Sequence, residues 1–215
     1  MPDLDVHSFT VGPVAENCFL FRVEGSDKAL IVDPGEEAER IVSAVDDLGV
    51  TVEAILLTHC HFDHIGAVAP VAKATGAPVY CPEIEVPVLA DIMSFVPWPG
   101  FGPYESYEAD ETVSGGEHLS FAGLEIDVLF TPGHSPGHVT YSIPDHRALF
   151  SGDVLFQGSV GRVDLPGGDG PTLLESIRSL VESHPEDTVV YPGHMGNTTL
   201  GAERATNPFL TELAR

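Results

Sequence analysis

Basic residues are scarce in this sequence, lysine above all. Only 9 Lys and Arg side chains stand against 33 Asp and Glu, so the formal net charge is −24. The only two lysines are Lys28 and Lys73. Such a charge repels nucleic-acid phosphates and anionic membrane surfaces. The sequence therefore predicts a protein whose partner is neither a nucleic acid nor a membrane.

Cysteine and long apolar runs are also scarce. Cys18, Cys60 and Cys81 are odd in number and scattered, a usage typical of reduced thiols in the cytoplasm. No run approaches the ~18 apolar residues of a membrane-spanning helix, and the N-terminus shows no signal peptide. We therefore expect a cytoplasmic protein. Cys60 lies between two histidines, but its alternating position favours packing in the core.

Metal-type side chains, by contrast, are present at four selected places. Short apolar runs that read as buried strands each end in His or Asp. The runs are residues 54–57, 126–130, 148–150 and 188–191. The side chains that follow them are His59, His61, Asp63, His64, His134, Asp153 and His194. Strands that end in this way could direct all seven side chains to one edge of a sandwich.

The spacing of the first cluster indicates two metal ions. His59 and His61 are two residues apart, so in an extended chain they project to the same side. Asp63 and His64 come where a helix begins, and the change of backbone direction would turn them toward a second ion. Six terminal ligands divide into three per ion, which leaves Asp153 as a bridge. Imidazoles with carboxylates suit zinc first, with iron or manganese as alternatives, and two such ions can activate water near neutral pH.

Four segments together resemble the metallo-β-lactamase superfold. They are His59-Cys60-His61-Phe62-Asp63-His64, Thr131-Pro132-Gly133-His134, Ser151-Gly152-Asp153 and Tyr191-Pro192-Gly193-His194. Val32-Asp33-Pro34-Gly35 is similar to the first motif of that family, whose Asp supports the metal site from behind. Three further segments resemble the short single-domain bacterial members of the glyoxalase II-like hydrolases. These are Gly152-Asp153-Val154-Leu155-Phe156, Gly161-Arg162-Val163-Asp164 and Asn207-Pro208-Phe209-Leu210.

The resemblance implies roles for individual residues. It assigns His59, His61 and His134 to the first metal. It assigns Asp63, His64 and His194 to the second metal, with Asp153 bridging both. It implies hydrolysis of an acyl-thiol thioester, such as S-lactoylglutathione, to a carboxylic acid and a free thiol. Asp63 would also hold the attacking water in line and accept its proton.

The resemblance leaves two other functions open. Persulfide dioxygenases have the same motifs but use one iron, which here would be held by His59, His134 and Asp153. Alternatively, the metals only hold the fold together and the chain is a non-catalytic binding module. A set of His and Asp without a cysteine ligand argues against a purely structural zinc site.

Candidate substrate contacts lie outside the metal motifs. Residues 93–107 form an aromatic loop with Trp98, Phe101 and Tyr104, which serves either as a lid or as core packing. Arg162 either binds a substrate carboxylate or pairs with Asp164. Asn197, close after His194, is a further candidate. The C-terminal helical domain of the long glyoxalase II enzymes is absent, so we expect loose preference among thiol carriers and weak salt dependence.

The remaining pattern predicts the architecture. We expect an α+β fold, a four-layered αβ/βα sandwich, formed by a single domain over residues 1–215. The predicted strands are 6–11, 17–23, 29–32, 78–81, 119–121, 124–130, 139–143 and 147–150, besides the four apolar runs. The predicted helices are 34–48, 68–74, 82–91 and one that begins at Pro171, and Thr198 or Thr199 would cap a last helix.

Overall fold

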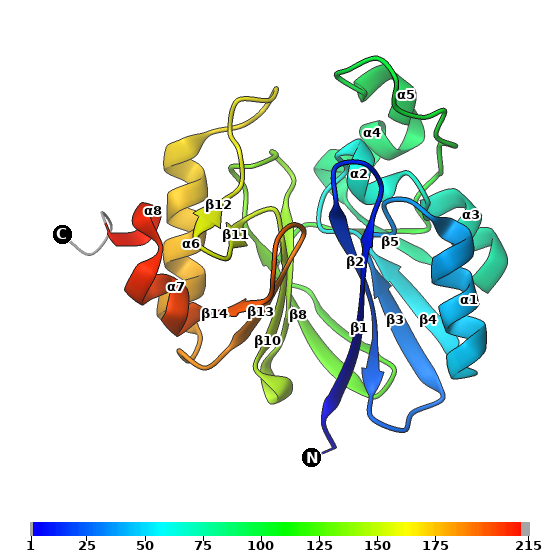
Figure 1. The fold of residues 1–215 in the computed structure, drawn as a ribbon, viewed down its shortest axis with the longest axis horizontal. Helices are drawn as coiled ribbons and strands as arrows, with labels where there is room; N and C mark the ends of the chain where they lie inside the picture. The colour runs from blue at the N-terminus through cyan, green and yellow to red at the C-terminus, as the bar shows by residue number, and fades with distance from the viewer. Residues whose placement is uncertain (1, 212–215) are drawn as a thin grey trace.

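Two mixed sheets pack face to face, and helices cover both outer faces (Figure 1). The structure is a computed structural model and describes residues 2–211, so Met1 and residues 212–215 of the predicted domain lie outside it. Buried side chains of both sheets, among them Phe21, Leu56, Tyr141 and Phe150, form the core between the sheets. The predicted four-layered αβ/βα sandwich is therefore confirmed.

The first sheet has the order β1-β2-β3-β4-β5-β6. Its first three strands are antiparallel, as the predicted meander requires, and β3 to β6 run parallel to one another. Parallel neighbours need crossover connections, and helices supply them. The strands are β1 Leu4–Val11, β2 Glu16–Val23, β3 Lys28–Val32, β4 Thr51–Leu56, β5 Val79–Pro82 and β6 Glu111–Val113.

The second sheet has the order β14-β13-β10-β9-β8-β7. The two predicted hairpins are present, and Ala122 and Gly123 turn the first of them with positive φ angles of 53° and 76°. The strands are β7 His118–Phe121, β8 Leu124–Phe130, β9 Val139–Ile143, β10 Ala148–Gly152, β13 Val189–Pro192 and β14 Thr198–Thr199. Beside the sheet, β11 Leu155–Phe156 and β12 Ser159–Val160 form a small hairpin.

The long helices bury one apolar face each. α1 Ala38–Leu48 and α3 Val68–Thr75 pack on the first sheet, and α6 Gly170–Ser183 and α7 Leu200–Thr206 lie beside the second. The prediction that the first helix opens at Pro34 is wrong, because Glu37 has a left-handed backbone and α1 begins after it. Thr199 caps α7 by accepting a hydrogen bond from the backbone N of Ala202, as expected. No helix among residues 2–211 is long and apolar enough to cross a membrane.

The segment between β5 and β6 differs from the prediction. One helix over 82–91 was expected, but η1 Glu83–Glu85 and α4 Val86–Ala90 divide that range. α5 Ile92–Phe95 overlaps the start of the predicted aromatic loop, and the non-helical backbone of Asp91, with φ −148° and ψ 61°, separates it from α4. The last helix of the described residues is the short α8 Pro208–Thr211. The short helix α2 Phe62–Ile65 belongs to the site described next.

Candidate metal centre

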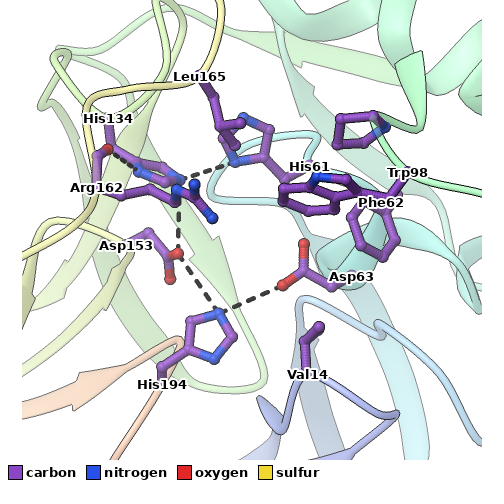
Figure 2. Close-up of a pocket in the computed structure, with 11 residues that line it drawn as sticks. Val14, His61, Phe62, Asp63, Trp98, His134, Asp153, Arg162, Leu165 and His194 are labelled. Atoms are coloured by element: carbon purple, nitrogen blue, oxygen red, sulfur yellow. Dashed lines mark hydrogen bonds and ion pairs between the residues drawn. The ribbon is translucent and has the colours of Figure 1, made fainter. Parts of the chain in front are cut away.

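Seven His and Asp side chains meet at one edge of the sandwich. Figure 2 shows those that line a pocket, namely His61, Asp63, His134, Asp153 and His194. His59 and His61 follow β4, and the short helix α2 carries Asp63 and His64. The other three extend from the loops after β8, β10 and β13: His134, Asp153 and His194. The structure thus brings together all the residues that the four strand ends were expected to direct to one place.

The first ligand set consists of His59, His61 and His134. The Nδ1 atom of His61 lies 3.1 Å from Nε2 of His59 and 2.8 Å from Nε2 of His134. Burial, and secondarily the neighbouring histidines, lowers the pKa of His59 well below its ordinary value and that of His61 to about 4. These two rings are therefore neutral at pH 7, and the three nitrogen lone pairs can converge on one cation.

The second ligand set consists of Asp63, His64 and His194. The Nε2 atom of His194 lies 3.3 Å from Oδ2 of Asp63, and Nε2 of His64 lies 3.9 Å from that oxygen. Burial opposes a charge on His64, but the carboxylates of Asp153 and Asp63 outweigh it and raise its pKa well above the ordinary value. The pKa of His194 is raised too, because the hydrogen bond with Asp63 and the charge of Asp153 outweigh burial.

Asp153 lies between the two sets. Its Oδ1 is 3.4 Å from Nε2 of His64, and its Oδ2 is 3.5 Å from Nε2 of both His134 and His194. Burial acts to raise the pKa of Asp153, but the charge of His64 outweighs it and holds the pKa well below the ordinary value. Asp153 is therefore an ionised carboxylate in contact with both sets.

Two buried atoms at this centre lack a hydrogen-bond partner, namely Nε2 of His64 and Oδ1 of Asp153. A buried polar atom without a partner is costly, and a cation between these atoms would satisfy both. The donor set of imidazoles and carboxylates also suits divalent transition metals. The residues therefore fit two ions, one held by each set, with Asp153 shared.

Hydrogen bonds from behind fix the orientation of the histidines. Asp33 accepts hydrogen bonds from the backbone N and the hydroxyl of Thr58, at 2.7 and 2.6 Å, and lies 3.0 Å from Nδ1 of His64. Nδ1 of His134 donates to the carbonyl of Arg162 at 2.8 Å. With Nδ1 engaged, the Nε2 atoms of His64 and His134 face Asp153, where each would ligate an ion. The support that the resemblance implied for Asp33 matches this geometry.

Of three buried residues that hold the ligand loops, sequence reasoning indicated His138 and missed Asn17 and Glu85. The amide of Asn17 donates to the carbonyls on both sides of the His194 loop, Pro192 O at 3.1 Å and Met195 O at 2.9 Å. Glu85 binds the loop of His134, and His138 accepts a hydrogen bond from the backbone N of Asp153 at 3.1 Å. Only His138 carried a signal, its place near His134 in the chain.

A pocket of about 150 Å³ opens beside the ligands. Besides ligands, it is lined by Val14, Phe62, Pro97, Trp98, Arg162 and Leu165. Of the candidate substrate residues, Trp98 and Arg162 are therefore placed on its wall (Figure 2). Its walls are mainly apolar, with one guanidinium among them.

The other three candidates lie elsewhere. Phe101 and Tyr104 pack against Phe62 behind the wall, and the hydroxyl of Tyr104 donates to Glu36 at 2.6 Å. Asn197 is exposed and does not line the pocket. The core-packing role predicted for the aromatic loop is confirmed for Phe101 and Tyr104, while Trp98 lines the pocket and the lid role stays a prediction.

Arg162 makes the internal ion pair that was one of its two predicted roles. Its Nε and Nη2 atoms donate to the two carboxylate oxygens of Asp164, both at 2.7 Å. Its guanidinium also lies 5.4 Å from the centre of the Trp98 ring, within cation–π range. Cys60 is fully buried with its sulfur 3.5 Å from that of Cys81, which confirms its expected place in the core.

Comparison with known proteins identifies the family. A family model described as the metallo-beta-lactamase superfamily matches residues 11–194. A probable metallo-hydrolase, YqgX of Bacillus subtilis, is 42% identical over 205 residues, which cover 93% of this chain and 94% of that protein. The hydroxyacylglutathione hydrolase GloC of Haemophilus influenzae is 32% identical over 209 residues, which cover 96% and 98%.

Solved structures are similar over nearly the whole chain. The crystal structure of the BLEG-1 B3 metallo-beta-lactamase has a TM-score of 0.91 and 40% identity, and the match covers 96% of this chain and 100% of that one. The structure of TTHA1623 in a di-iron-bound form has a TM-score of 0.84 and 41% identity, with 95% and 100% covered. The fold of this protein, its two ligand sets and its similarity to these relatives show that the chain belongs to the metallo-β-lactamase superfamily.

Proposed function

We propose that this protein is a cytoplasmic metallo-hydrolase of the glyoxalase II type, which cleaves a small acyl-thiol thioester. The observation that carries the proposal is the pair of ligand sets joined by Asp153 beside a mainly apolar pocket. The similarity to the hydroxyacylglutathione hydrolase GloC supports the choice of thioesters within the superfamily.

Two divalent ions, zinc first among the candidates and iron or manganese next, would be held by the two ligand sets. When bound, such ions polarise a carbonyl group and lower the pKa of water. The protein's own residues arrange the reactants around them. Asp63 faces the pocket with a lowered pKa, because the charge of His64 and the hydrogen bond from His194 outweigh its burial. Its ionised carboxylate can accept a hydrogen bond from the attacking water and orient it.

The pocket wall determines how the thioester lies. The apolar side chains of Val14, Phe62 and Leu165 can pack against the acyl group and exclude other water molecules. A space of about 150 Å³ accommodates a short acyl group and leaves most of the thiol carrier outside. We therefore propose a small-molecule thioester as the substrate, with its carbonyl beside the two ligand sets, where the ions would polarise it, and its thiol arm toward Trp98.

An assay of metal-loaded protein with S-lactoylglutathione and other thioesters tests the proposal. We expect release of free thiol that stops when a chelator removes the metal, and that falls sharply in Asp63→Ala while the melting temperature is kept. Hydrolysis of no thioester above the buffer rate would refute it. If Asp63→Ala instead lowers the melting temperature strongly and no activity exists to lose, the protein is the metal-stabilised binding module.

Two other activities are distinguished in the same experiment. The similarity to BLEG-1 makes β-lactam hydrolysis the second candidate, so a chromogenic cephalosporin belongs in the panel. Cleavage of it at a higher kcat/KM than any thioester would replace the proposed function. One iron per chain with oxygen uptake would instead indicate persulfide oxidation by His59, His134 and Asp153. Two metals per chain without oxygen uptake exclude it.

A further inference from the structure

A buried carboxylate in the segment between β5 and β6 holds the loop that carries His134. Glu85 lies in η1, and only 4% of its surface is exposed. Its Oε1 atom accepts a hydrogen bond from the hydroxyl of Ser135 at 2.7 Å and one from the backbone N of Gly137 at 2.8 Å. We propose that Glu85 is a positioning residue that fixes His134 for the first metal and couples this ligand to the wall of the substrate pocket.

The loop after β8 is held on two sides of His134. Before it, the hydroxyl of Ser176 donates to Pro132 O and the backbone N of Asp169 donates to Gly133 O, both at 2.7 Å, and after it Glu85 supplies the contacts. Within the loop, the backbone N of Gly133 donates to the carbonyl of Ser135 at 3.2 Å. On the opposite side, the ring of His134 donates to Arg162. Glu85 therefore holds the backbone just after His134 while Arg162 orients its ring. Both donors are buried with Glu85, so loss of this acceptor would leave them without a partner.

Close approach of the two segments depends on Gly137. A Cβ atom at this position would lie 2.7 Å from Cγ and 2.9 Å from Oε1 of Glu85. A side chain there would push the carboxylate away from both donors. The glycine and the buried acid thus form one contact, although they lie 52 residues apart in the chain.

The same segment also supplies a wall of the pocket. From Glu85 the chain passes through α4 and α5 to Trp98, whose ring lies beneath the guanidinium of Arg162. The segment therefore meets the His134 loop directly at Glu85, and again at Trp98 through Arg162. Displacement of the His134 loop would move both contacts. Because Trp98 is the only tryptophan of the chain, its fluorescence reports on this wall alone.

Metal binding to three variants tests the proposal without any substrate. Metal-depleted wild type, Glu85→Gln, Ser135→Ala and Glu85→Ala are titrated with Co²⁺, and NMR signals of the His59, His61 and His134 rings identify the first set. We expect Glu85→Ala to bind Co²⁺ at this set at least about 10-fold more weakly, as with other partners of metal ligands. Glu85→Gln keeps an oxygen acceptor and should stay within about 2-fold, with Ser135→Ala between them.

Trp98 emission supplies the second measurement. Co²⁺ binding at the first set should change the emission of the wild type and of Glu85→Gln, whereas Glu85→Ala should show a smaller change at equal occupancy. Each result concerns the metal and the wall, so a failure to hydrolyse thioesters leaves this test intact. If Glu85→Ala does not fold, Ser135→Ala against Glu85→Gln decides, and equal affinity in those two variants refutes the proposal.

Glu203→Ala is the matched control. Glu203 is also buried, 2% exposed, and accepts hydrogen bonds from Gly158 N at 2.8 Å and Thr198 Oγ1 at 2.6 Å, in loops other than that of His134. It should leave the first set within about 2-fold of the wild type. Unchanged Co²⁺ binding in Glu85→Ala, or equal weakening in Glu203→Ala, would show that Glu85 has no specific effect on His134.

Discussion

The two ligand sets share Asp153 but differ in the direction in which the pKa values of two histidines in each set are shifted. In the first set, burial keeps His59 and His61 neutral by lowering their pKa values. In the second set, carboxylates raise the pKa values of His64 and His194, so that these rings hold protons. A cation that binds His59 and His61 therefore meets rings with lowered pKa values, whereas one that binds His64 and His194 competes with protons that these rings hold more tightly.

The difference follows from the local chain. His59 and His61 stand on extended backbone among other histidines, with no acid of their own cluster between them. Asp63 is the second residue of α2, directly before His64, so the turn that redirects the chain also places an acid beside the imidazole. One six-residue segment thus supplies both environments.

Removal of Asp153 should have the largest effect, because its side chain contacts both ligand sets and links them. In Asp153→Ala we expect thioester hydrolysis to fall about 10³-fold or more, and metal content to drop below two ions per chain. Metal analysis and initial rates measure the two effects. Asp145→Ala, at an exposed acid in a turn of the second sheet, should change neither. Two ions retained in Asp153→Ala would mean that the sets do not depend on it.

The ligands could be predicted from the sequence, because each follows the end of an apolar run by only a few residues. Strand periodicity also predicted the long strands and the sandwich. The residues that hold the loops could not be found in this way. Asn17 binds Pro192 O across 175 residues and Glu85 binds Gly137 across 52. Such contacts depend on tertiary packing, and the periodicity that predicted the strand over 17–23 and the helix over 82–91 does not indicate which distant loop each side chain binds.

Local breaks in the backbone account for the remaining differences. Glu37 delays α1 and Asp91 divides α4 from α5, and neither conformation has a sequence rule as strict as that of proline. Strands of two or three residues, such as β6 and β14, are too short to show alternation. The candidates Phe101 and Tyr104 were chosen by composition, which cannot separate a pocket wall from the core behind it.

Substitution of one ligand in each set should separate the metal binding of the first set from that of the second. His134→Ala should lose the first ion and His194→Ala the second, leaving about one ion per chain and about 10²-fold lower activity in each. The remaining ion should bind more weakly as pH falls from 8 to 6.5 in His134→Ala, because it competes with protons on His64 and His194. In His194→Ala the affinity should depend less on pH over that range, because the pKa values of His59 and His61 are lowered. Metal titrations at the two pH values decide, and equal pH dependence would contradict the comparison.

The stability of metal-depleted protein should show the same contrast. The folded pKa of His61 is about 4 against about 6.5 in the unfolded chain, so the unfolded state binds more protons between these values. Stability from this residue is present above pH 6.5 and is lost as pH falls toward 4, roughly 2 kcal/mol between pH 7 and pH 5. His61→Asn should remove that slope in urea unfolding.

His194 should act in the opposite direction. Its folded pKa is raised, so its contribution is complete below the unfolded value and is lost as pH rises through the folded one. His194→Asn should therefore flatten the alkaline side of the same curve. If both variants changed the same side, the two sets would not differ in the way described.

The smallest effect concerns the charge of the pocket wall next to the first set. Asp164 neutralises Arg162 through an exposed bidentate pair, so the wild type should discriminate little between thiol carriers and respond weakly to salt. In Asp164→Asn the guanidinium is free to attract a carboxylate. We expect kcat/KM for a glutathione thioester to rise about two- to five-fold relative to an uncharged N-acetylcysteamine thioester, and to become salt-dependent. Asp187→Asn, which removes the partner of Arg147 far from the pocket, gives the same net charge change and should leave the ratio unchanged. A similar shift in both variants would mean that overall charge, and not this pair, sets the preference.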